Sequence, residues 1–213
     1  MEKYAVLFDL DGTLLDTLED IHDAIQHSLR QCGYPERTLA ETRQFVGNGA
    51  RRLMEQAVPA GEDPANALAA FQAFYPTHCQ IKTRPYDGIP EALAVLQERY
   101  PIAIVSNKPD TAVQPLCAHH FPGIYARGER PGCPRKPYPD MVYQTMADIG
   151  AEKCVYIGDS EVDVLTARNA GVPCISVLWG FRDKADMEAV GAEHFCGTTA
   201  DLIQTIEEII HGK

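Results

Sequence analysis

The chain has 213 residues, of which 45% are hydrophobic, and a formal net charge of −11 at pH 7. This length suits one large domain or a core with a smaller appendage. The acidic charge argues against nucleic acid and anionic membranes as partners, and the apolar runs are shorter than the roughly 20 residues that cross a bilayer. The seven cysteines form no C-x-x-C pair, so a disulfide framework or a zinc site is not expected. Without a recognisable secretory signal, these features predict a reduced, cytoplasmic protein.

Short apolar runs alternate with helical patterns over most of the chain. Strands are predicted at Tyr4–Phe8, Ile102–Ser106, Cys154–Gly158, Cys174–Leu178 and, more weakly, near Phe195. Helices are predicted at Glu91–Arg99, Asp140–Ile149, Val162–Ala170 and Ala200–Ile210. This alternation predicts an α/β fold, in which a doubly wound, Rossmann-like parallel sheet is covered by helices on both faces.

Residues 16–84 interrupt the alternation with a purely helical pattern. Apolar spacing, a capping box and proline positions predict four helices here: Leu18–Leu29, a helix capped by Thr38, Ala50–Val58, and a helix that begins after Asp63 and ends or kinks at Pro76. We therefore predict an all-helical cap domain over 16–84, inserted into a core formed by 1–15 and 85–213. Hinges are expected near Asp16–Leu18 and Thr83–Gly88.

Polar residues follow three of the predicted strands, at the edge where parallel sheets bind ligands. They are Asp9 and Asp11 after the first strand, Ser106, Asn107 and Lys108 after the second, and Asp159 and Asp163 after the third. A further lysine, Lys136, precedes the helix before that third strand. Because one sheet edge collects all of these residues, we expect them to form one site.

The carboxylates at the end of the first strand require positive charge nearby, because burying an unpaired carboxylate costs several kcal/mol. Asp9, Asp11 and Asp159 could surround a hard divalent cation such as Mg²⁺, and Lys136 would add a second positive charge. A serine hydroxyl and backbone N–H groups can bind phosphate oxygens. One aspartate could then attack phosphorus while the other donates a proton to the leaving oxygen.

Four motifs in order, DLDGTLLDT, SNK, KPYPD and GDSEVD, resemble those of the haloacid dehalogenase superfamily. The resemblance covers essentially the whole chain, with the cap inserted after the first motif. Within the superfamily the chain looks most like the phosphoglycolate phosphatases, which also tend to carry a G-N-G-type cap loop. The resemblance implies a Mg²⁺-dependent phosphatase that acts on a small phosphomonoester, most simply phosphoglycolate, through an aspartyl-phosphate.

The resemblance also implies a role for each matching residue. Asp9 would be the nucleophile and a metal ligand, and Asp11 the general acid and then base, with its backbone carbonyl on the metal. Asp159 would be a direct metal ligand, whereas Asp163 would hold a metal-bound water or Lys136. Ser106 and the backbone of Asn107 would bind the phosphoryl group, and Lys136 would balance its charge and that of Asp9. From the residues alone, Lys136 could instead be a solvated loop lysine, and Asp163 a first-turn aspartate favoured by the helix dipole.

The cap is expected to determine substrate specificity, because the predicted core residues contact only the phosphoryl group. The loop Gly47-Asn48-Gly49 permits close backbone approach, and the following helix would open an anion site. Arg51 and Arg52 lie about 100° apart on that helix, so at most one would face a substrate carboxylate. In the alternative interpretation the glycines only turn the chain and both arginines are solvated.

Other activities stay open at this stage. A β-phosphoglucomutase-like phosphomutase would commonly carry a histidine twelve positions after the nucleophile, where this chain has Ile21. Pyrophosphatase activity, seen among similar proteins, also stays open. A dehalogenase would not usually keep a carboxylate at the place of Asp11. A receiver-type signalling domain, which is not an enzyme, would carry its phosphoacceptor on a later strand and would need no cap.

Overall fold

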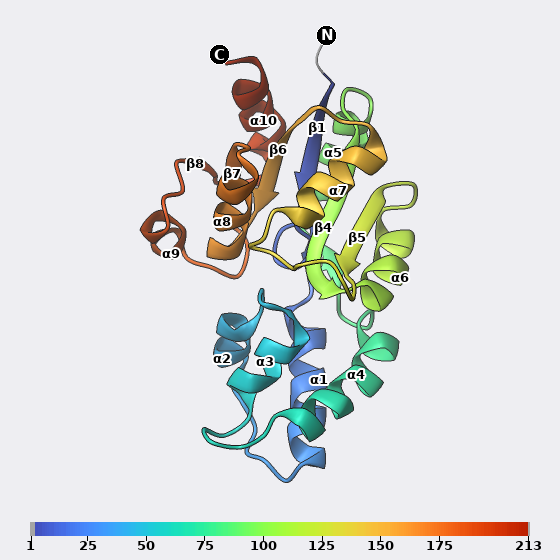
Figure 1. Ribbon diagram of the computed structural model, residues 1–213, viewed down its shortest axis with the longest axis vertical. Helices are drawn as coiled ribbons and strands as arrows, with labels where there is room; N and C mark the ends of the chain where they lie inside the picture. Colours follow the sequence, from blue (N-terminus) through green and yellow to red (C-terminus); the bar gives the residue numbers. More distant parts are fainter. Residues whose placement is uncertain (1–2, 213) are drawn as a thin grey trace.

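The computed structural model describes residues 3–212, and a parallel sheet forms its centre. Within these residues the large sheet has six strands in the order β5-β4-β1-β6-β7-β8, and every neighbouring pair is parallel. The strands are β1 (Tyr4–Phe8), β4 (Ile102–Pro109), β5 (Tyr125–Glu129), β6 (Lys153–Gly158), β7 (Cys174–Val177) and β8 (His194–Cys196). In Figure 1 the arrows of β1 and β6 point toward a separate group of helices, so the carboxyl edge of the sheet faces that group.

Helices cover both faces of the sheet. Alternate side chains of β1 point to opposite faces, and each set packs against a different group of helices. Val6 and Phe8 pack on one side with residues of α5 (Ile89–Gln97), α6 (Asp110–His120) and α10 (Leu202–His211). Ala5 and Leu7 pack on the other side with residues of α7 (Asp140–Ile149) and α8 (Glu161–Ala170). Both faces being buried explains why the strand reads as a continuous apolar run. The predicted doubly wound α/β fold is confirmed.

The structure also contains elements that the sequence patterns did not indicate. They include α6, β5, the short helix α9 (Lys184–Ala189), the 3₁₀ turn η1 (Thr199–Asp201) and the last three residues of β4. α6 contains Pro115, and proline is ordinarily a signal against a helix interior. β5 contains Arg127, whose buried guanidinium donates hydrogen bonds to Thr145 and Gln144. Tertiary partners therefore make these segments regular where the local pattern does not.

Four helices form the cap: α1 (Leu18–Gln31), α2 (Leu39–Phe45), α3 (Gly49–Ala57) and α4 (Ala65–His78). The capping box at α2 is present, since the Glu41 N–H donates to Thr38 Oγ1 and the Thr38 N–H donates to the Glu41 carboxylate. Of the two outcomes predicted at Pro76, an end or a kink, the end is wrong, because the helix continues past that residue to His78. In Figure 1 these helices lie together beyond the carboxyl edge of the sheet.

The two crossings between core and cap lie side by side. β2 (Leu15–Asp16) pairs antiparallel with β3 (Arg84–Pro85). The buried Asp20 carboxylate accepts the N–H groups of Lys82 and Thr83 at 2.9–3.0 Å. A carboxylate in the first turn of α1 thus fastens the returning chain to the outgoing one. The predicted domain boundaries at residues 16 and 84 fall within this strand pair.

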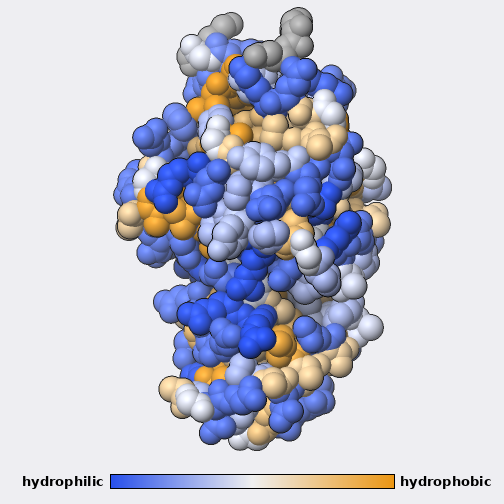
Figure 2. Space-filling view, viewed as in Figure 1, coloured by the Kyte–Doolittle hydropathy of each residue, from blue (hydrophilic) through white to orange (hydrophobic). Residues whose placement is uncertain are grey.

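Hydrophilic side chains cover most of the face shown in Figure 2, with hydrophobic ones in small groups. This distribution agrees with the net charge of −11, which favours solvation of the surface. Among the helices of residues 3–212, none is long and apolar enough to cross a membrane.

Candidate active site

The three central strands of the sheet deliver the predicted site residues to one place. Asp9 and Asp11 directly follow β1, Asp159 directly follows β6, and Ser106 and Asn107 lie near the end of β4. Because β4, β1 and β6 are neighbours, these residues converge at the carboxyl edge. The first turn of α8 adds Asp163, and the segment between β5 and α7 adds Lys136.

Three buried carboxylates and one lysine form the centre of the site. Asp9, Asp159 and Asp163 each offer an oxygen, and these oxygens lie within 4.8 Å of one another. Lys136 Nζ lies 2.9 Å from Asp9 Oδ1 and 2.8 Å from Asp163 Oδ1, and its side chain is 1% exposed. The ammonium also donates to Tyr156 Oη, which in turn donates to the Val105 carbonyl. The interpretation of Lys136 as a solvated loop lysine is therefore wrong.

The cluster carries more negative charge than Lys136 alone can balance. Burial, reinforced by the charge of Asp163, outweighs the attraction of Lys136 and raises the pKa of Asp9 to about 7. Burial and the charges of Asp163 and Asp9 raise the pKa of Asp159 to about 8. Oxygen donors, burial and excess negative charge are what a hard divalent cation such as Mg²⁺ requires. The residues present therefore fit a metal.

The oxygens of Asp163 are already engaged. Oδ1 is bound by Lys136, and Oδ2 accepts the N–H of Ser160 at 3.1 Å and its hydroxyl at 2.6 Å. Asp163 is thus both a first-turn helix aspartate and the anchor of Lys136, so the two interpretations of the sequence describe the same side chain. Such contacts suit a residue that orients its neighbours rather than one that holds the metal directly.

Two glycines allow the carboxylates to approach the backbone this closely. Gly12 has φ +83°, and a Cβ there would lie 2.3 Å from Asp159 Oδ2. A Cβ on Gly158 would lie 2.2 Å from the Asp163 side chain. Backbone this close to a side chain leaves no room for any other residue, so both glycines are needed to form the cluster.

Asp11 faces away from the cluster toward a second lysine. Its Oδ1 accepts hydrogen bonds from Lys108 Nζ at 2.6 Å and Thr17 Oγ1 at 2.8 Å. Burial by itself would lower the pKa of Lys108, but the interactions with Asp11 and Tyr75 outweigh it, so the pKa of Lys108 is raised. The sequence analysis predicted that Lys108 lies at this edge of the sheet but assigned no function to it. The feature of the sequence that could have indicated a role for Lys108 is its place in the motif SNK at the end of a predicted strand. In the structure this strand, β4, continues through Lys108 to Pro109.

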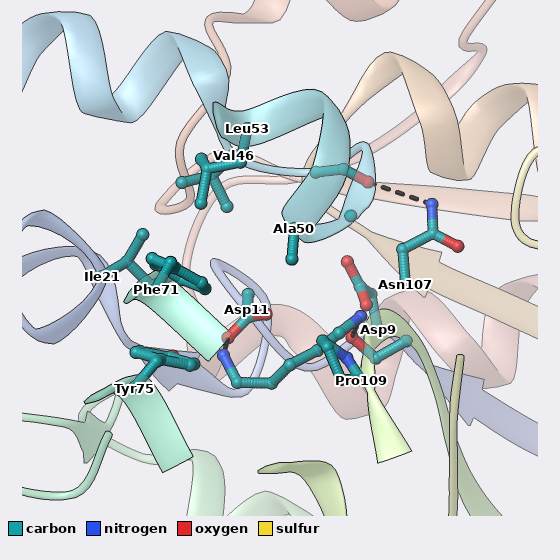
Figure 3. A pocket seen from close by; sticks show the side chains of 14 residues that line it. Asp9, Asp11, Ile21, Val46, Ala50, Leu53, Phe71, Tyr75, Asn107 and Pro109 are labelled. Carbon is teal, nitrogen blue, oxygen red and sulfur yellow. Dashed lines mark hydrogen bonds and ion pairs between the residues drawn. The ribbon is translucent and has the colours of Figure 1, made fainter. Parts of the chain in front are cut away.

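Asn107 connects three segments through its side chain. Its amide nitrogen donates to the carbonyls of Gly47 and Lys136, each at 3.0 Å, and its amide oxygen accepts the Lys136 N–H at 2.8 Å. Figure 3 shows the bond that reaches across to the cap. The prediction from the sequence concerned only the backbone of this residue, and the linking role of its amide was missed. Ser106 Oγ accepts the Lys108 N–H at 3.3 Å.

A cavity of about 50 Å³ lies between core and cap (Figure 3). Since a water molecule needs about 10–15 Å³ of such space, the cavity suits only a small group. The core contributes Asp9, Asp11, Ser106, Asn107, Lys108 and Pro109 to its walls, and the cap contributes Ile21, Val46, Gly47, Gly49, Ala50, Leu53, Phe71 and Tyr75. The site is therefore charged on the core side and mainly apolar on the cap side.

The cap loop is only partly as predicted. Gly47 and Gly49 line the cavity, whereas Asn48, Arg51 and Arg52 do not. Both arginine side chains are more than half exposed, and both pair with Glu55. The predicted placement of an arginine toward the substrate is therefore wrong for this structure. α3 turns Ala50 and Leu53 into the cavity, and at 100° per residue this points positions 51 and 52 elsewhere.

Comparison with known proteins identifies the family. The model of the haloacid dehalogenase-like hydrolases matches residues 6–177, and the chain belongs to this family. It is 31% identical to the phosphoglycolate phosphatase of Mesorhizobium japonicum, with 97% of each chain covered. It is 32% identical to a 5′-nucleotidase of Pseudomonas aeruginosa, with 95% of each covered.

The solved structures lead to the same group of enzymes. The crystal structure of a candidate phosphoglycolate phosphatase from Lactobacillus delbrueckii subsp. bulgaricus superimposes with a TM-score of 0.90. It is 35% identical, and the match covers 97% of this chain and 99% of that one. Within its family the protein is thus a phosphatase, a phosphoric monoester hydrolase that resembles the phosphoglycolate phosphatases.

Proposed function

We propose that this phosphatase uses Mg²⁺ to hydrolyse a small phosphomonoester that bears a carboxylate, most simply phosphoglycolate, through an aspartyl-phosphate on Asp9. The observation that carries the proposal is the buried group of three carboxylates and Lys136, with Asp11 beside it but held apart. One carboxylate is thereby available to attack phosphorus, and another is separate enough to handle protons.

In the first half-reaction an oxygen of Asp9 bonds to phosphorus, and the bond from phosphorus to the ester oxygen breaks. Asp11 gives its proton to that oxygen, and the alcohol leaves. In the second half-reaction Asp11 accepts a proton from a water that attacks the aspartyl-phosphate, which releases phosphate and restores Asp9. Each half-reaction is balanced in protons, so Asp11 is ready for the next turnover.

The remaining core residues hold the phosphoryl group. Ser106 and the backbone of Asn107 would bind its oxygens, and Lys136 would offset the charge that it shares with Asp9. Mg²⁺ would be held by Asp9, Asp159 and the backbone carbonyl of Asp11, and would supply positive charge for the phosphoryl oxygens. These roles follow the family resemblance, and the placement of the side chains supports them.

The cavity and the similar proteins support a small substrate. Its size of about 50 Å³ leaves room for only about three to five water-sized groups, which favours a short group attached to the phosphoryl group. In addition, Gly47, Asn48 and Gly49 bring the start of α3 to the cavity, where backbone N–H groups favour an anion. Similar proteins are named phosphoglycolate phosphatases.

A 5′-nucleotidase activity is the second candidate, because a 32% identical protein carries that name. A nucleoside is far larger than the cavity, so this activity would need the cap to open. The structure gives less support to a phosphomutase. Ile21 lines the cavity, while the neighbouring His22 is engaged inside the cap with Thr42 and Gln26.

Phosphate release from a panel of esters tests the proposal. Purified protein with Mg²⁺ should show its highest kcat/KM on phosphoglycolate, with pyrophosphate, β-glucose 1-phosphate and nucleoside 5′-monophosphates well below. Higher activity on a nucleotide would favour the second candidate, and no phosphate release from any ester would refute the proposal. Acid quenching with ³²P-labelled substrate should trap a hydroxylamine-sensitive label on the protein, as an acyl phosphate requires.

A further inference from the structure

One end of the cavity is polar and is made by residues of both domains. Lys108 of the core has a side chain only 3% exposed, and its ammonium lies 4.8 Å from the centre of the Tyr75 ring in the cap. The Tyr75 hydroxyl is buried beside this ammonium and interacts with it, but within residues 3–212 no hydrogen bond of good geometry satisfies it. A buried hydroxyl without a well-formed hydrogen bond is destabilising, so it calls for a further partner.

The ammonium of Lys108 has capacity for a further ligand. It carries three N–H donors. Asp11 Oδ1 accepts one of them at 2.6 Å, and the nearby Tyr75 side chain engages at most a second. Around it the cap wall is apolar, with Ile21, Val46 and Phe71 facing the same space (Figure 3). Lys108 is also the one cationic side chain among the residues that line the cavity.

We propose that Lys108, assisted by the Tyr75 hydroxyl, binds a second anionic group of the substrate, which is located beyond the ester oxygen. The inference rests on the proposed function, in which Asp11 donates to that oxygen. Lys108 Nζ lies 2.6 Å from Asp11 Oδ1. A carboxylate joined through one methylene to the ester oxygen would therefore reach the ammonium while the oxygen contacts Asp11.

This assignment replaces the predicted role of the cap arginine. Arg51 is 75% exposed, so water screens its charge, whereas Lys108 acts in a buried setting where a charge is worth more. The apolar wall strengthens the selection, because low polarity increases the attraction of Lys108 for an anion, whereas the N–H donors of a neutral amide would find no acceptor on that wall. The substrate class is thus a short phosphomonoester with a carboxylate one carbon beyond the ester oxygen.

Kinetics on a matched pair of substrates test this role. 2-Phosphoglycolate and its neutral amide, 2-phosphoglycolamide, have nearly the same shape and differ in the charge of the distal group. Wild-type enzyme should prefer the acid in kcat/KM by about 10- to 100-fold, the usual worth of a charged hydrogen bond. Lys108→Met should abolish most of this preference, whereas Lys184→Met, an exposed lysine paired with Glu188, should keep it.

The ratio between the two substrates separates binding from a purely structural role. If Lys108 only neutralised Asp11, Lys108→Met would slow both substrates alike and leave the preference intact, and this result would overturn the inference. So would a wild-type enzyme that does not distinguish the acid from the amide. Both results leave the phosphatase function standing, whereas absence of phosphate release from both esters and from acetyl phosphate would refute that function instead.

A second variant keeps the test decisive if Lys108→Met does not fold. Tyr75→Phe removes only the hydroxyl and keeps the ring that packs against Phe71 at 4.9 Å between centroids. We expect KM for 2-phosphoglycolate to rise about 10- to 100-fold, as for the loss of one hydrogen bond to a charged group, with a smaller change for the amide. Equal effects on both substrates, or none on either, would remove Tyr75 from the assignment.

Discussion

The core and the cap present opposite surfaces to the same cavity. The core side carries Asp9, Asp11 and Lys108, all of which are held in place by ion pairs. The cap side is lined mainly by apolar residues, including Val46, Leu53 and Phe71, with the hydroxyl of Tyr75 as an exception. The core therefore provides chemistry that would act on any phosphoryl group, whereas the cap restricts the size and polarity of what is attached to it.

The largest effect is expected on the core side, at the nucleophile. Asp9→Asn should lower kcat by about 10⁴-fold or more, because an amide cannot form the acyl phosphate and binds a metal more weakly. Phosphate release from phosphoglycolate gives the rate, and circular dichroism shows whether the fold is retained. Asp87→Asn, an exposed position in the core, is the matched control and should keep wild-type activity. Substantial turnover by Asp9→Asn would contradict the mechanism.

A smaller effect, and one that depends on the leaving group, is expected at Asp11. Asp11→Asn should slow phosphoglycolate hydrolysis by about 10²- to 10⁴-fold, the usual contribution of a general acid–base residue. The loss should be smaller for the first step with acetyl phosphate, since acetate leaves without being protonated. Rapid-quench measurement of the first turnover isolates that step. Equal losses on both substrates would show that Asp11 does not act as the acid.

The acidic cluster should also govern how stability depends on pH. In the folded, metal-free protein the pKa values of Asp9 and Asp159, about 7 and about 8, lie above their ordinary value of 3.8. Between these limits the folded state binds more protons than the unfolded state, so the free energy of unfolding falls as pH rises. Their contribution is fully present below about pH 4 and is lost as pH passes through 7 to 8.

Thermal melts between pH 5.5 and 9 check this dependence. In EDTA the Tm should fall from pH 5.5 to about 8 and level off above that, and Mg²⁺ should raise it most at the alkaline end, where the carboxylates are ionised. Asp159→Asn is the control, because removing one carboxylate should flatten the fall in EDTA and weaken the response to Mg²⁺. A wild-type protein whose Tm in EDTA declines no more than that of Asp159→Asn would contradict the prediction.

The same contrast explains which features the sequence could predict. The strand alternation and the residues at the strand ends were sufficient for five of the six strands of the large sheet and for the convergence of Asp9, Ser106 and Asp159, because parallel topology fixes where strand ends meet. The position of Lys136 beside them followed from the family resemblance. Their chemical roles came from the family resemblance and stay predictions. The core elements that were missed, such as β5 with its buried Arg127, depend on partners distant in the sequence.

The directions in which the cap side chains point were less predictable from the sequence than the strand ends of the core. Glycines and arginines near an expected helix start suggested an anion site, but Arg51 pairs with Glu55 on the outside of α3. The angular position of a helix about its own axis is set by tertiary packing, and here Ala50 and Leu53 turn inward. Lys108 was visible in the motif SNK, yet its partner Asp11 comes from the segment after β1 and its partner Tyr75 from the cap.

The smallest predicted effect concerns the contact between the two regions. Arg182, in the segment after β7, donates from its guanidinium to the carbonyls of Arg43, Gln44 and Val46 at 2.6–3.1 Å, and Glu161 orients it at 3.0 Å. These carbonyls lie at the end of α2, where the helix dipole favours a cation. The guanidinium therefore holds the cap wall against the core.

Replacing Arg182 should shift the cap toward open forms and weaken substrate binding. Arg182→Ala should raise KM for phosphoglycolate by about 3- to 10-fold, because a less populated closed form lowers apparent affinity in proportion. Arg182→Lys keeps the charge but lacks the planar fork that reaches several carbonyls, so it should be impaired as well. Arg30→Ala, which removes an exposed ion pair within the cap, is the control for loss of a surface arginine. If Arg182→Ala and Arg30→Ala give the same KM as wild type, the contact does not control closure, and the cavity between core and cap is maintained by other contacts such as Asn107 to Gly47.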